Sequence, residues 1–313
     1  MNYFITSLRN LELIDMEEDV IEILPGINIT NNKSIKEKLL NKVIIQAIGF
    51  VETTHILESK NFLYYEYDLE DYQKANNEQF LFIILIWLDD LLKNSWLIKD
   101  NCMDCDYAFL GKNIHLLSGE FSSNLIASRS TLASGHIDVI TLNKTEIREW
   151  VKIHDKVEMY LHNQNSSSTE FMLEKHFSRI GRCLAFVKAA RKSINLAYKI
   201  LNYCSAFETL LTTDITELSH KLSERAAFYL QYKFENKLDT YLTLKYAYNI
   251  RSKLTHGGTL KPSEIERLSE ISMKCDQYLR ELLVGILKDE KKVSLFDGQS
   301  DGIETYFNQL IFK

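Results

Sequence analysis

The segment RSKLTHGG at positions 251–258 places Arg251 five positions before His256. A guanidinium group grips phosphate oxygens through a fork of parallel hydrogen bonds, and an imidazole accepts or donates a proton near neutral pH. Together these are the groups that cleavage of an RNA phosphodiester needs in the absence of a metal ion. The simpler interpretation is an exposed arginine followed by a histidine that caps a helix.

A helix must position these two residues. Apolar and aromatic residues at helical spacing predict one from Thr240 to the glycines at 257 and 258, which favour the left-handed conformation that ends helices: Tyr241, Leu244, Tyr248 and Leu254. His256 then lies in the last turn, where unpaired carbonyl groups favour its protonated form. Arg251 and His256 point about 140° apart on an ideal helix. We therefore expect a composite site, formed by two such helices across the twofold axis of a dimer.

Three separated blocks resemble a known family in residue types, order and spacing. They are FETLL at 207–211, ELSHKLSERAA at 217–227 and the RSKLTHGG segment. Together they resemble the Apea-like branch of the HEPN superfamily over residues 174–288, and no comparable resemblance covers the first 165 residues. The resemblance implies an all-helical domain that forms a homodimer and, in many members, a metal-independent endoribonuclease without a cofactor.

The resemblance also assigns roles. Arg251 and His256 match the catalytic pair of the family's R-x4-6-H motif, and Ser252 stands where many active members carry a polar residue. The implied reaction is attack of the RNA 2′-hydroxyl on the adjacent phosphate, which leaves a 2′,3′-cyclic phosphate and a 5′-hydroxyl. We expect a cytoplasmic effector that cuts single-stranded RNA or tRNA, a toxin or antiviral (antiphage) defence protein under a protein regulator or trigger. The alternative is a non-catalytic HEPN module that binds RNA or a protein partner, and a third interpretation is a dimeric structural adaptor.

An acidic residue interrupts an apolar stripe before Thr212. The stripe predicts one helix with Glu208 on its buried side, among Val187, Ala190, Ile194, Ala197, Leu201, Cys204 and Leu211. A buried carboxylate without a cation is costly, and Arg225 is the predicted partner. The pair either orients two helices in the core or supports Arg251. His220, one turn before Glu224, reads as a surface histidine.

Basic residues gather between positions 174 and 199, where seven stand against one acid. The chain as a whole has a net charge of -6, which argues against a protein that coats nucleic acid indiscriminately. The local excess predicts contact with the RNA backbone, although a basic face in water is the simpler alternative. The predicted RNA-binding residues are Arg179, Arg182, Lys188, Arg191, Lys192 and Lys253.

Composition and the cysteines limit where the protein acts and whether it binds a metal. The N-terminus lacks the basic start and apolar run of a signal peptide, and the apolar run from Phe80 to Leu88 is too short for a membrane span and reads as a buried helix core. Five scattered cysteines indicate reduced thiols in the cytoplasm. Cys102 and Cys105 form a lone C-x-x-C in a predicted polar loop. A zinc site needs two more ligands, and only the distant His115 and His136 could supply them. We therefore predict ordinary thiols and no metal.

The fold class predicted is mainly α, with a smaller α+β domain before the helical bundle. The N-terminal domain, residues 1–165, has no phosphate-binding loop or hydrolase motif and is predicted to act as a sensor or specificity domain. Its predicted strands are 19–24, 61–67, 113–118 and 137–142, and a turn at Pro25-Gly26 closes the first of them. Its predicted helices are 34–47, 78–94 and 145–162.

A polar linker at 163–169 leads to the helical domain, residues 170–290, and then to a tail, residues 291–313. After Pro262, Ser263 and Glu266 predict a capping box for a helix with one apolar face: Ile265, Leu268, Cys275, Leu279, Leu282 and Ile286. The tail is predicted to pass through a flexible loop, 297–302, to an apolar end that docks on a domain or on a second subunit.

Overall fold

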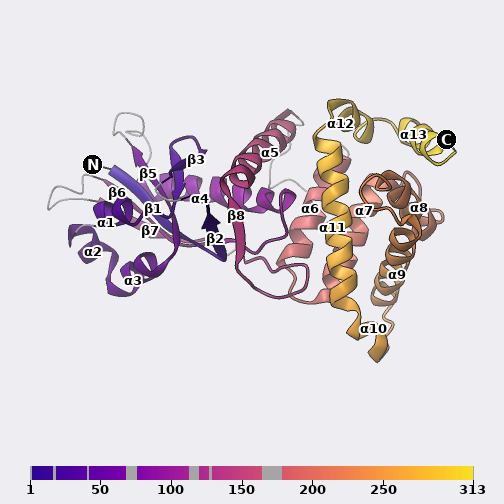
Figure 1. The fold of residues 1–313 in the computed structure, drawn as a ribbon, viewed down its shortest axis with the longest axis horizontal. Coiled ribbons are helices and arrows are strands. Elements are labelled where there is room, and N and C mark those ends of the chain that lie inside the picture. The colour runs from indigo at the N-terminus through magenta and orange to yellow at the C-terminus, as the bar shows by residue number, and fades with distance from the viewer. Residues whose placement is uncertain are drawn as a thin grey trace. The chain divides into compact units, whose positions relative to one another are not determined.

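The computed structural model describes residues 2–16, 19–40, 42–67, 76–112, 120–126, 129–163 and 178–312. It divides into two compact units (Figure 1), of which the first comprises residues 1–130 and 137–154 and the second comprises 131–136 and 155–313. The strands belong to the first unit and the second is helical. A mainly α protein with an α+β N-terminal part is therefore confirmed. The predicted linker lies, apart from Asn163, outside the described residues.

The first unit is built on an antiparallel sheet with the strand order β3-β4-β5-β1-β6-β7. Its strands are β1 (Asn2–Arg9), β3 (Ile21–Leu24), β4 (Ile27–Thr30), β5 (Asn61–Tyr67), β6 (Asp104–Lys112) and β7 (Glu120–Asn124). A parallel pair, β2 (Leu11–Ile14) and β8 (Ile140–Asn143), stands beside it. Seven consecutive residues of β1 are buried, so both of its faces are covered and its residues alternate between two cores.

Helices supply the other halves of these cores. Phe4 and Leu8 of β1 pack in a core with α4 (Asn77–Asn94) and the start of α5 (Lys144–Asn163). Tyr3 and Ile5 face the opposite core, formed with α1 (Lys33–Leu39), α2 (Lys42–Ile48) and α3 (Phe50–Glu58). A short 3-10 turn, η2 (Ser95–Leu97), follows α4. Trp150 of α5 is fully buried and donates its indole N–H to the Leu91 carbonyl at 2.8 Å.

The strongest periodic patterns of this unit are confirmed, at β5, α4 and α5. The predicted helix 34–47 is wrong as one element, because α1 ends at Leu39 and α2 begins at Lys42. The first and last predicted strands begin later than expected, at Ile21 and Ile140. Cys105 lies in β6 and not in a loop. The predicted strand 113–118 lies outside the described residues.

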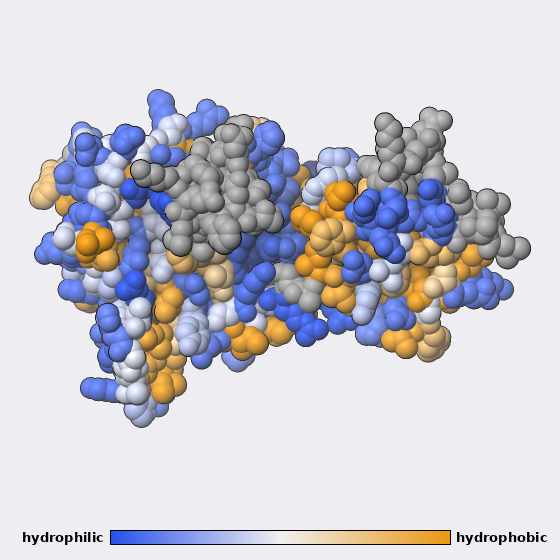
Figure 2. All heavy atoms as spheres, turned by 180° about the vertical axis from the view of Figure 1, so that it is seen from behind, coloured by the Kyte–Doolittle hydropathy of each residue, from blue (hydrophilic) through white to orange (hydrophobic). Residues whose placement is uncertain are grey.

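The apolar run of α4 is only half buried, which corrects its interpretation as a buried helix core. One side packs on the sheet, whereas Phe82 and Trp87 are 50% and 49% exposed, and apolar surface lies over this helix in Figure 2. The run therefore serves one face of an amphipathic helix. Among the described residues, no helix combines the length and the apolar composition that a membrane crossing needs.

The second unit packs its helices around α7 and α11. The elements are α6 (Arg179–Lys192), α7 (Leu196–Leu211), α8 (Leu218–Tyr229), α9 (Lys237–Thr255), α10 (Pro262–Glu266), α11 (Leu268–Leu287), α12 (Glu290–Phe296) and α13 (Ser300–Ile311). The single helix predicted over 187–211 is wrong. Ser193 takes an extended conformation, and Asn195 starts α7 by accepting hydrogen bonds from two backbone N–H groups. Ile194, in the break, is 76% exposed.

The C-terminal elements differ in detail from those predicted. The carboxylate of Glu264, not that of Glu266, accepts the Lys261 N–H at 2.8 Å at the start of α10. Ile265 is exposed, and the other five members of the predicted apolar face are buried in α11. The predicted flexible loop shortens to 297–299, because α13 begins at Ser300. The apolar end docks within its own unit, where Ile303 and Phe307 of α13 are buried and the helix packs on α8.

The cysteines give a direct chemical test of this packing. All five are thiols outside any disulfide and only Cys105 is partly exposed, and burial raises the pKa of the Cys183, Cys204 and Cys275 thiols. Because the thiolate is the reactive form, Ellman's reagent should modify one thiol per chain rapidly in the native protein and all five after denaturation. Rapid modification of a Cys105→Ser variant would contradict this packing.

Candidate functional site

Arg251 faces α7 from the half-buried side of α9. Its Nη2 lies 3.5 Å from either carboxylate oxygen of Glu208, and its guanidinium carbon lies 5.2 Å from the centre of the Tyr248 ring. The Tyr248 hydroxyl is hydrogen-bonded to Glu208; burial, followed by the charge of that carboxylate, raises the pKa of Tyr248 to about 12. A carboxylate and an aromatic face therefore hold the guanidinium in one orientation.

The pairing of Glu208 corrects the sequence prediction. Its cation is Arg251, so the interpretation that it supports Arg251 fits and the predicted pair with Arg225 is wrong. Arg225 is 5% exposed, donates to the Leu211 carbonyl at 2.7 Å and pairs with Glu304 of α13 at 2.5 Å. Arg225 therefore links three helices, because it lies on α8 and contacts both the end of α7 and Glu304 of α13.

An open pocket lies beside Arg251. It has a volume of about 500 Å³, and Arg179 and Arg182 of α6 line it together with Arg251 and Glu208. The other polar lining comes from Ser205, Thr209, Thr212, Thr213 and Asp214. The three arginines around one opening are donors suited to phosphate oxygens. The four hydroxyl groups donate their hydrogens within the protein, to the Leu201, Ala206 and Glu208 carbonyls and to the Glu304 carboxylate.

Two of the pocket's charges also hold structure. Arg179 donates to the Thr212 and Thr209 carbonyls, at 2.7 and 3.3 Å, at the end of α7, and burial lowers its pKa. Asp214 pairs with Lys221 at 2.6 Å, and hydrogen bonds from Lys221 and Thr216 lower the pKa of Asp214 to about 2. Lys221 thus offsets the charge of Asp214, which leaves the arginines to set the local sign.

His256 ends α9 as predicted. Its backbone N–H donates to the Ser252 carbonyl at 3.1 Å, and Gly257 takes the left-handed conformation, with φ of 72°. The His256 side chain is exposed and does not line the pocket of Arg251; Ser252 is half-buried. Within one chain the described residues therefore do not bring the arginine and the histidine into one pocket. A composite site in a dimer stays a prediction.

The predicted RNA-binding residues do not form one exposed face. Arg182 and Lys188 are half-buried and Lys192 is exposed, but Arg191 is only 2% exposed. Lys253 is paired with Glu264 at 2.6 Å. The break after Lys192 replaces the one long basic helix by two helices, and Arg191 is buried next to that break. Of the set, only Arg179 and Arg182 join Arg251 at the pocket.

Sequence reasoning missed two contributors to this site. The apolar period marks Tyr248 only as a core-facing position of α9, but a tyrosine three residues before an arginine also lies next to it on a helix. The hydroxyl groups of the segment after Glu208 gave no periodic signal. His220, predicted as a surface histidine, is half-exposed, and its Nε2 lies 4.0 Å from Glu224.

Comparisons of the chain with protein-family models, with curated proteins and with solved structures gave no match. No group of three or more metal-ligating side chains that could hold a metal ion occurs in the part of the chain that the structure describes. Cys102 donates its thiol hydrogen to the Asp138 carbonyl at 3.2 Å. His136 is exposed, and His115 lies outside the described residues.

Proposed function

We propose that the helical unit is a metal-independent endoribonuclease of the HEPN type, which acts as a homodimer on single-stranded RNA or tRNA. The observation that carries the proposal is the convergence of Arg179, Arg182 and Arg251 at one open pocket. Phosphate is the ligand that such donors recognise best. The exposed His256 at the end of the same helix supplies a group that transfers protons at neutral pH.

In the proposed reaction, Arg251 holds the non-bridging oxygens of the scissile phosphate. The 2′-hydroxyl of the RNA loses its proton and attacks phosphorus, and the bond to the 5′-oxygen breaks as that oxygen gains a proton. His256 carries out one of these two proton transfers. Glu208 and Tyr248 orient Arg251, so that its charge is in place when negative charge builds up on the phosphate.

The direct test is incubation of the purified protein with a mixed pool of tRNA and single-stranded RNA in the presence of a chelator. Cleavage to 2′,3′-cyclic phosphate and 5′-hydroxyl ends supports the proposal. Cleavage that stops when the chelator is added, or that leaves 3′-hydroxyl ends, contradicts it. Purified catalytic variants distinguish this activity from a contaminating nuclease.

A subunit-mixing experiment tests the composite site. Arg251→Ala and His256→Ala chains, each inactive alone, are refolded together in equal amounts. If the arginine of one subunit works with the histidine of the other, about a quarter of wild-type activity returns, because half of the dimers are mixed and each holds one intact site of two. Complementation that fails although mixed dimers are shown to form would place both residues in one chain.

A second function has two observations in its favour. Arg251 is already paired with Glu208, and His256 lies outside the pocket, which suits a module that binds RNA or a protein partner without cutting. The two functions separate at His256→Ala. A nuclease loses cleavage and keeps RNA binding, whereas a binding module shows no cleavage to lose and binds as before, with an affinity that falls as salt rises.

The setting of the activity belongs to the same proposal. Free cysteines throughout the chain fit a reducing compartment, and we assign the protein to the cytoplasm. There it would serve as a toxin or antiphage-defence effector, held silent until a protein regulator or trigger releases it.

A further inference from the structure

A second open pocket, the α8–α9 pocket, adjoins the pocket of Arg251 in the helical unit. It lies where the segment before α8 and the start of that helix meet α9, and these two helices lie side by side (Figure 1). Its volume is about 410 Å³. Ile215 lines both this pocket and the pocket of Arg251, so the two openings share part of their rim.

Tyr248 forms the wall between the two pockets. The centre of its ring lies 5.2 Å from the guanidinium carbon of Arg251. Its hydroxyl is hydrogen-bonded to Glu208, which lines the pocket of Arg251, and Tyr248 itself lines the α8–α9 pocket. A nucleotide strand whose phosphate is held by Arg251 therefore has the α8–α9 pocket within reach of its neighbouring base.

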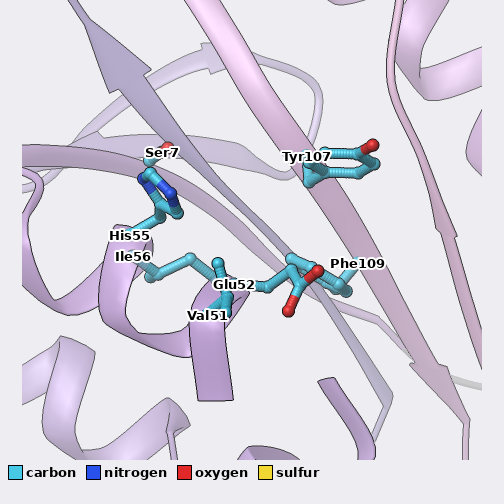
Figure 3. Close-up of a pocket in the computed structure, with 7 residues that line it drawn as sticks. All are labelled: Ser7, Val51, Glu52, His55, Ile56, Tyr107 and Phe109. Atoms are coloured by element: carbon cyan, nitrogen blue, oxygen red, sulfur yellow. The ribbon is translucent and has the colours of Figure 1, made fainter. Parts of the chain in front are cut away.

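The walls of the α8–α9 pocket suit a flat ring. Ile215 at the rim is 90% exposed, and the aliphatic Leu218 and the aromatic Tyr248 are half-buried. Bases of single-stranded RNA bind proteins by stacking on such side chains. A cavity of about 150 Å³ accommodates one benzene ring, so this pocket has room for a base, whereas the pocket between α3 and the sheet of the first unit, at about 100 Å³, does not (Figure 3).

Glu217 gives the α8–α9 pocket a carboxylate without a cation. In the part of the chain that the structure describes, neither an ion pair nor a hydrogen bond holds this carboxylate. The residue takes the left-handed conformation, with φ of 51°, which is uncommon outside glycine. A carboxylate accepts hydrogen bonds only and repels phosphate. The pocket therefore favours a base with hydrogen-bond donors on its edge and leaves the phosphates to the arginines.

Lys245 of α9 adds a positive charge beside this carboxylate-bearing pocket. It is exposed, its ammonium lies 5.4 Å from the centre of the Tyr241 ring, and no carboxylate among the described side chains pairs with it. It precedes Arg251 by six residues, which is about 9 Å along the helix axis. A lysine binds phosphate as a point charge, so Lys245 and Arg251 can hold successive phosphates on either side of one base.

His220 completes the polar lining but is engaged within the protein. Its Nδ1 lies 3.0 Å from the Tyr241 hydroxyl, and its Nε2 lies 4.0 Å from Glu224. Both ring nitrogens are thus directed at neighbours in the same chain. Glu217 and Lys245 are therefore the charged groups that a ligand meets in this pocket.

We propose that the α8–α9 pocket binds a guanine base of the RNA, next to the phosphate that Arg251 holds. Guanine is the one RNA base that presents two adjacent donors, N1–H and the N2 amino group, to the two oxygens of a carboxylate such as Glu217. Its ring lies against Tyr248 and Ile215, and Lys245 binds the next phosphate along the strand. The inference rests on the proposed function in that the ligand is RNA, and it makes Glu217 the residue that selects the base.

The test uses the full-length protein and fluorescein-labelled tetranucleotides with 2′-O-methyl sugars, which lack the hydroxyl that the cleavage reaction needs. Binding is measured by fluorescence anisotropy at one salt concentration. Wild type should bind UGUU about tenfold more tightly than UAUU, which is the discrimination expected from one bidentate contact to a base. Inosine in place of the guanosine lacks the N2 amino group and should bind with intermediate affinity.

Substitutions at the two charges separate base selection from charge. Glu217→Gln replaces a pair of acceptors by one acceptor and one donor, so UGUU and UAUU should bind within about twofold of each other. Lys245→Gln should weaken both by the same factor and lower the slope of log affinity against log salt by about 1. Two exposed residues outside both pockets are the matched controls. Glu235→Gln and Lys237→Gln should preserve the preference and the affinity.

The outcomes also separate this inference from the proposed ribonuclease. The inference is overturned if the folded wild type binds UGUU and UAUU equally or binds neither, or if Glu217→Gln keeps the preference. A protein that cuts RNA but shows no preference for guanosine loses the inference alone. A protein that leaves RNA uncut but prefers UGUU, with the preference lost in Glu217→Gln, keeps the inference and loses the ribonuclease.

Discussion

Alanine at Arg251 or at His256 should reduce RNA cleavage at least about a thousandfold, because each substitution removes a group that acts only as the transition state forms. Arg251→Ala removes the clamp on the phosphate oxygens, and Arg251→Lys should restore little, because an ammonium group lacks the planar fork. His256→Ala removes the proton carrier. Both are measured as initial rates of cleavage of an end-labelled RNA in chelator.

Matched residues of the same unit serve as controls. Arg267, like Arg251, lies over a tyrosine of α9, with its guanidinium carbon 4.6 Å from the Tyr246 ring, and His220 is a half-exposed histidine that borders the neighbouring pocket. Arg267→Ala and His220→Ala should each cleave within about threefold of wild type, since neither lines the pocket of Arg251. Cleavage that survives in Arg251→Ala or His256→Ala would remove the pair from the reaction.

Lys199→Ala should lower the free energy of unfolding by about 4 kcal/mol, the largest effect on stability that we expect from a single lysine. Lys199 is fully buried, and its ammonium donates to the carbonyls of Ala190, Arg191 and Thr131 at 3.0, 3.4 and 3.3 Å. Two of these carbonyls end α6, where a positive charge is favourable. The substitution leaves all three without this donor and opens a cavity.

The distribution of tryptophan makes this measurement specific. All three tryptophans, Trp87, Trp96 and Trp150, lie in the first unit, so their fluorescence follows that unit alone while far-UV circular dichroism follows both. In urea, Lys199→Ala should move the dichroism transition to lower concentration. Lys192→Ala, at the exposed lysine that ends α6, should leave the free energy of unfolding within about 0.5 kcal/mol of wild type. Equal midpoints for the two variants would contradict the buried role of Lys199.

The sequence predicts the long regular elements of this fold well, for a physical reason. The helices α4, α5, α9 and α11 each bury one face against a core, and that requirement gives their residues a helical period. Both faces of β5 are covered, with Phe62 in one core and Leu63 in the other, and its aromatic residues mark it as a strand. The breaks are harder, because they depend on single side chains. Asn195 divides the segment 187–211 into two helices because it caps the start of α7, and the apolar period gives no sign of this break.

The candidate site divides in the same way. Arg251 and His256 could be selected from residue type and spacing, and the end of α9 at Gly257 followed from glycine's conformational freedom. The pairing of charges could not be predicted from period alone, because the partner of Arg225 is Glu304, on a helix that docks from the far end of the chain. Lys199 shows the same limit, since a lysine in a basic run gives no sign that its ammonium is needed by buried carbonyls.

The chain passes between the two compact units more than once, since residues 131–136 and 155–163 belong with the helices while 137–154 belong with the sheet. A gene fragment that starts after residue 163 loses Thr131, which exchanges hydrogen bonds with Arg191 and Lys199. It also loses Tyr160, whose hydroxyl bonds to Ser178 and Asp297. No single cut in the chain therefore separates the helical unit intact from the first unit.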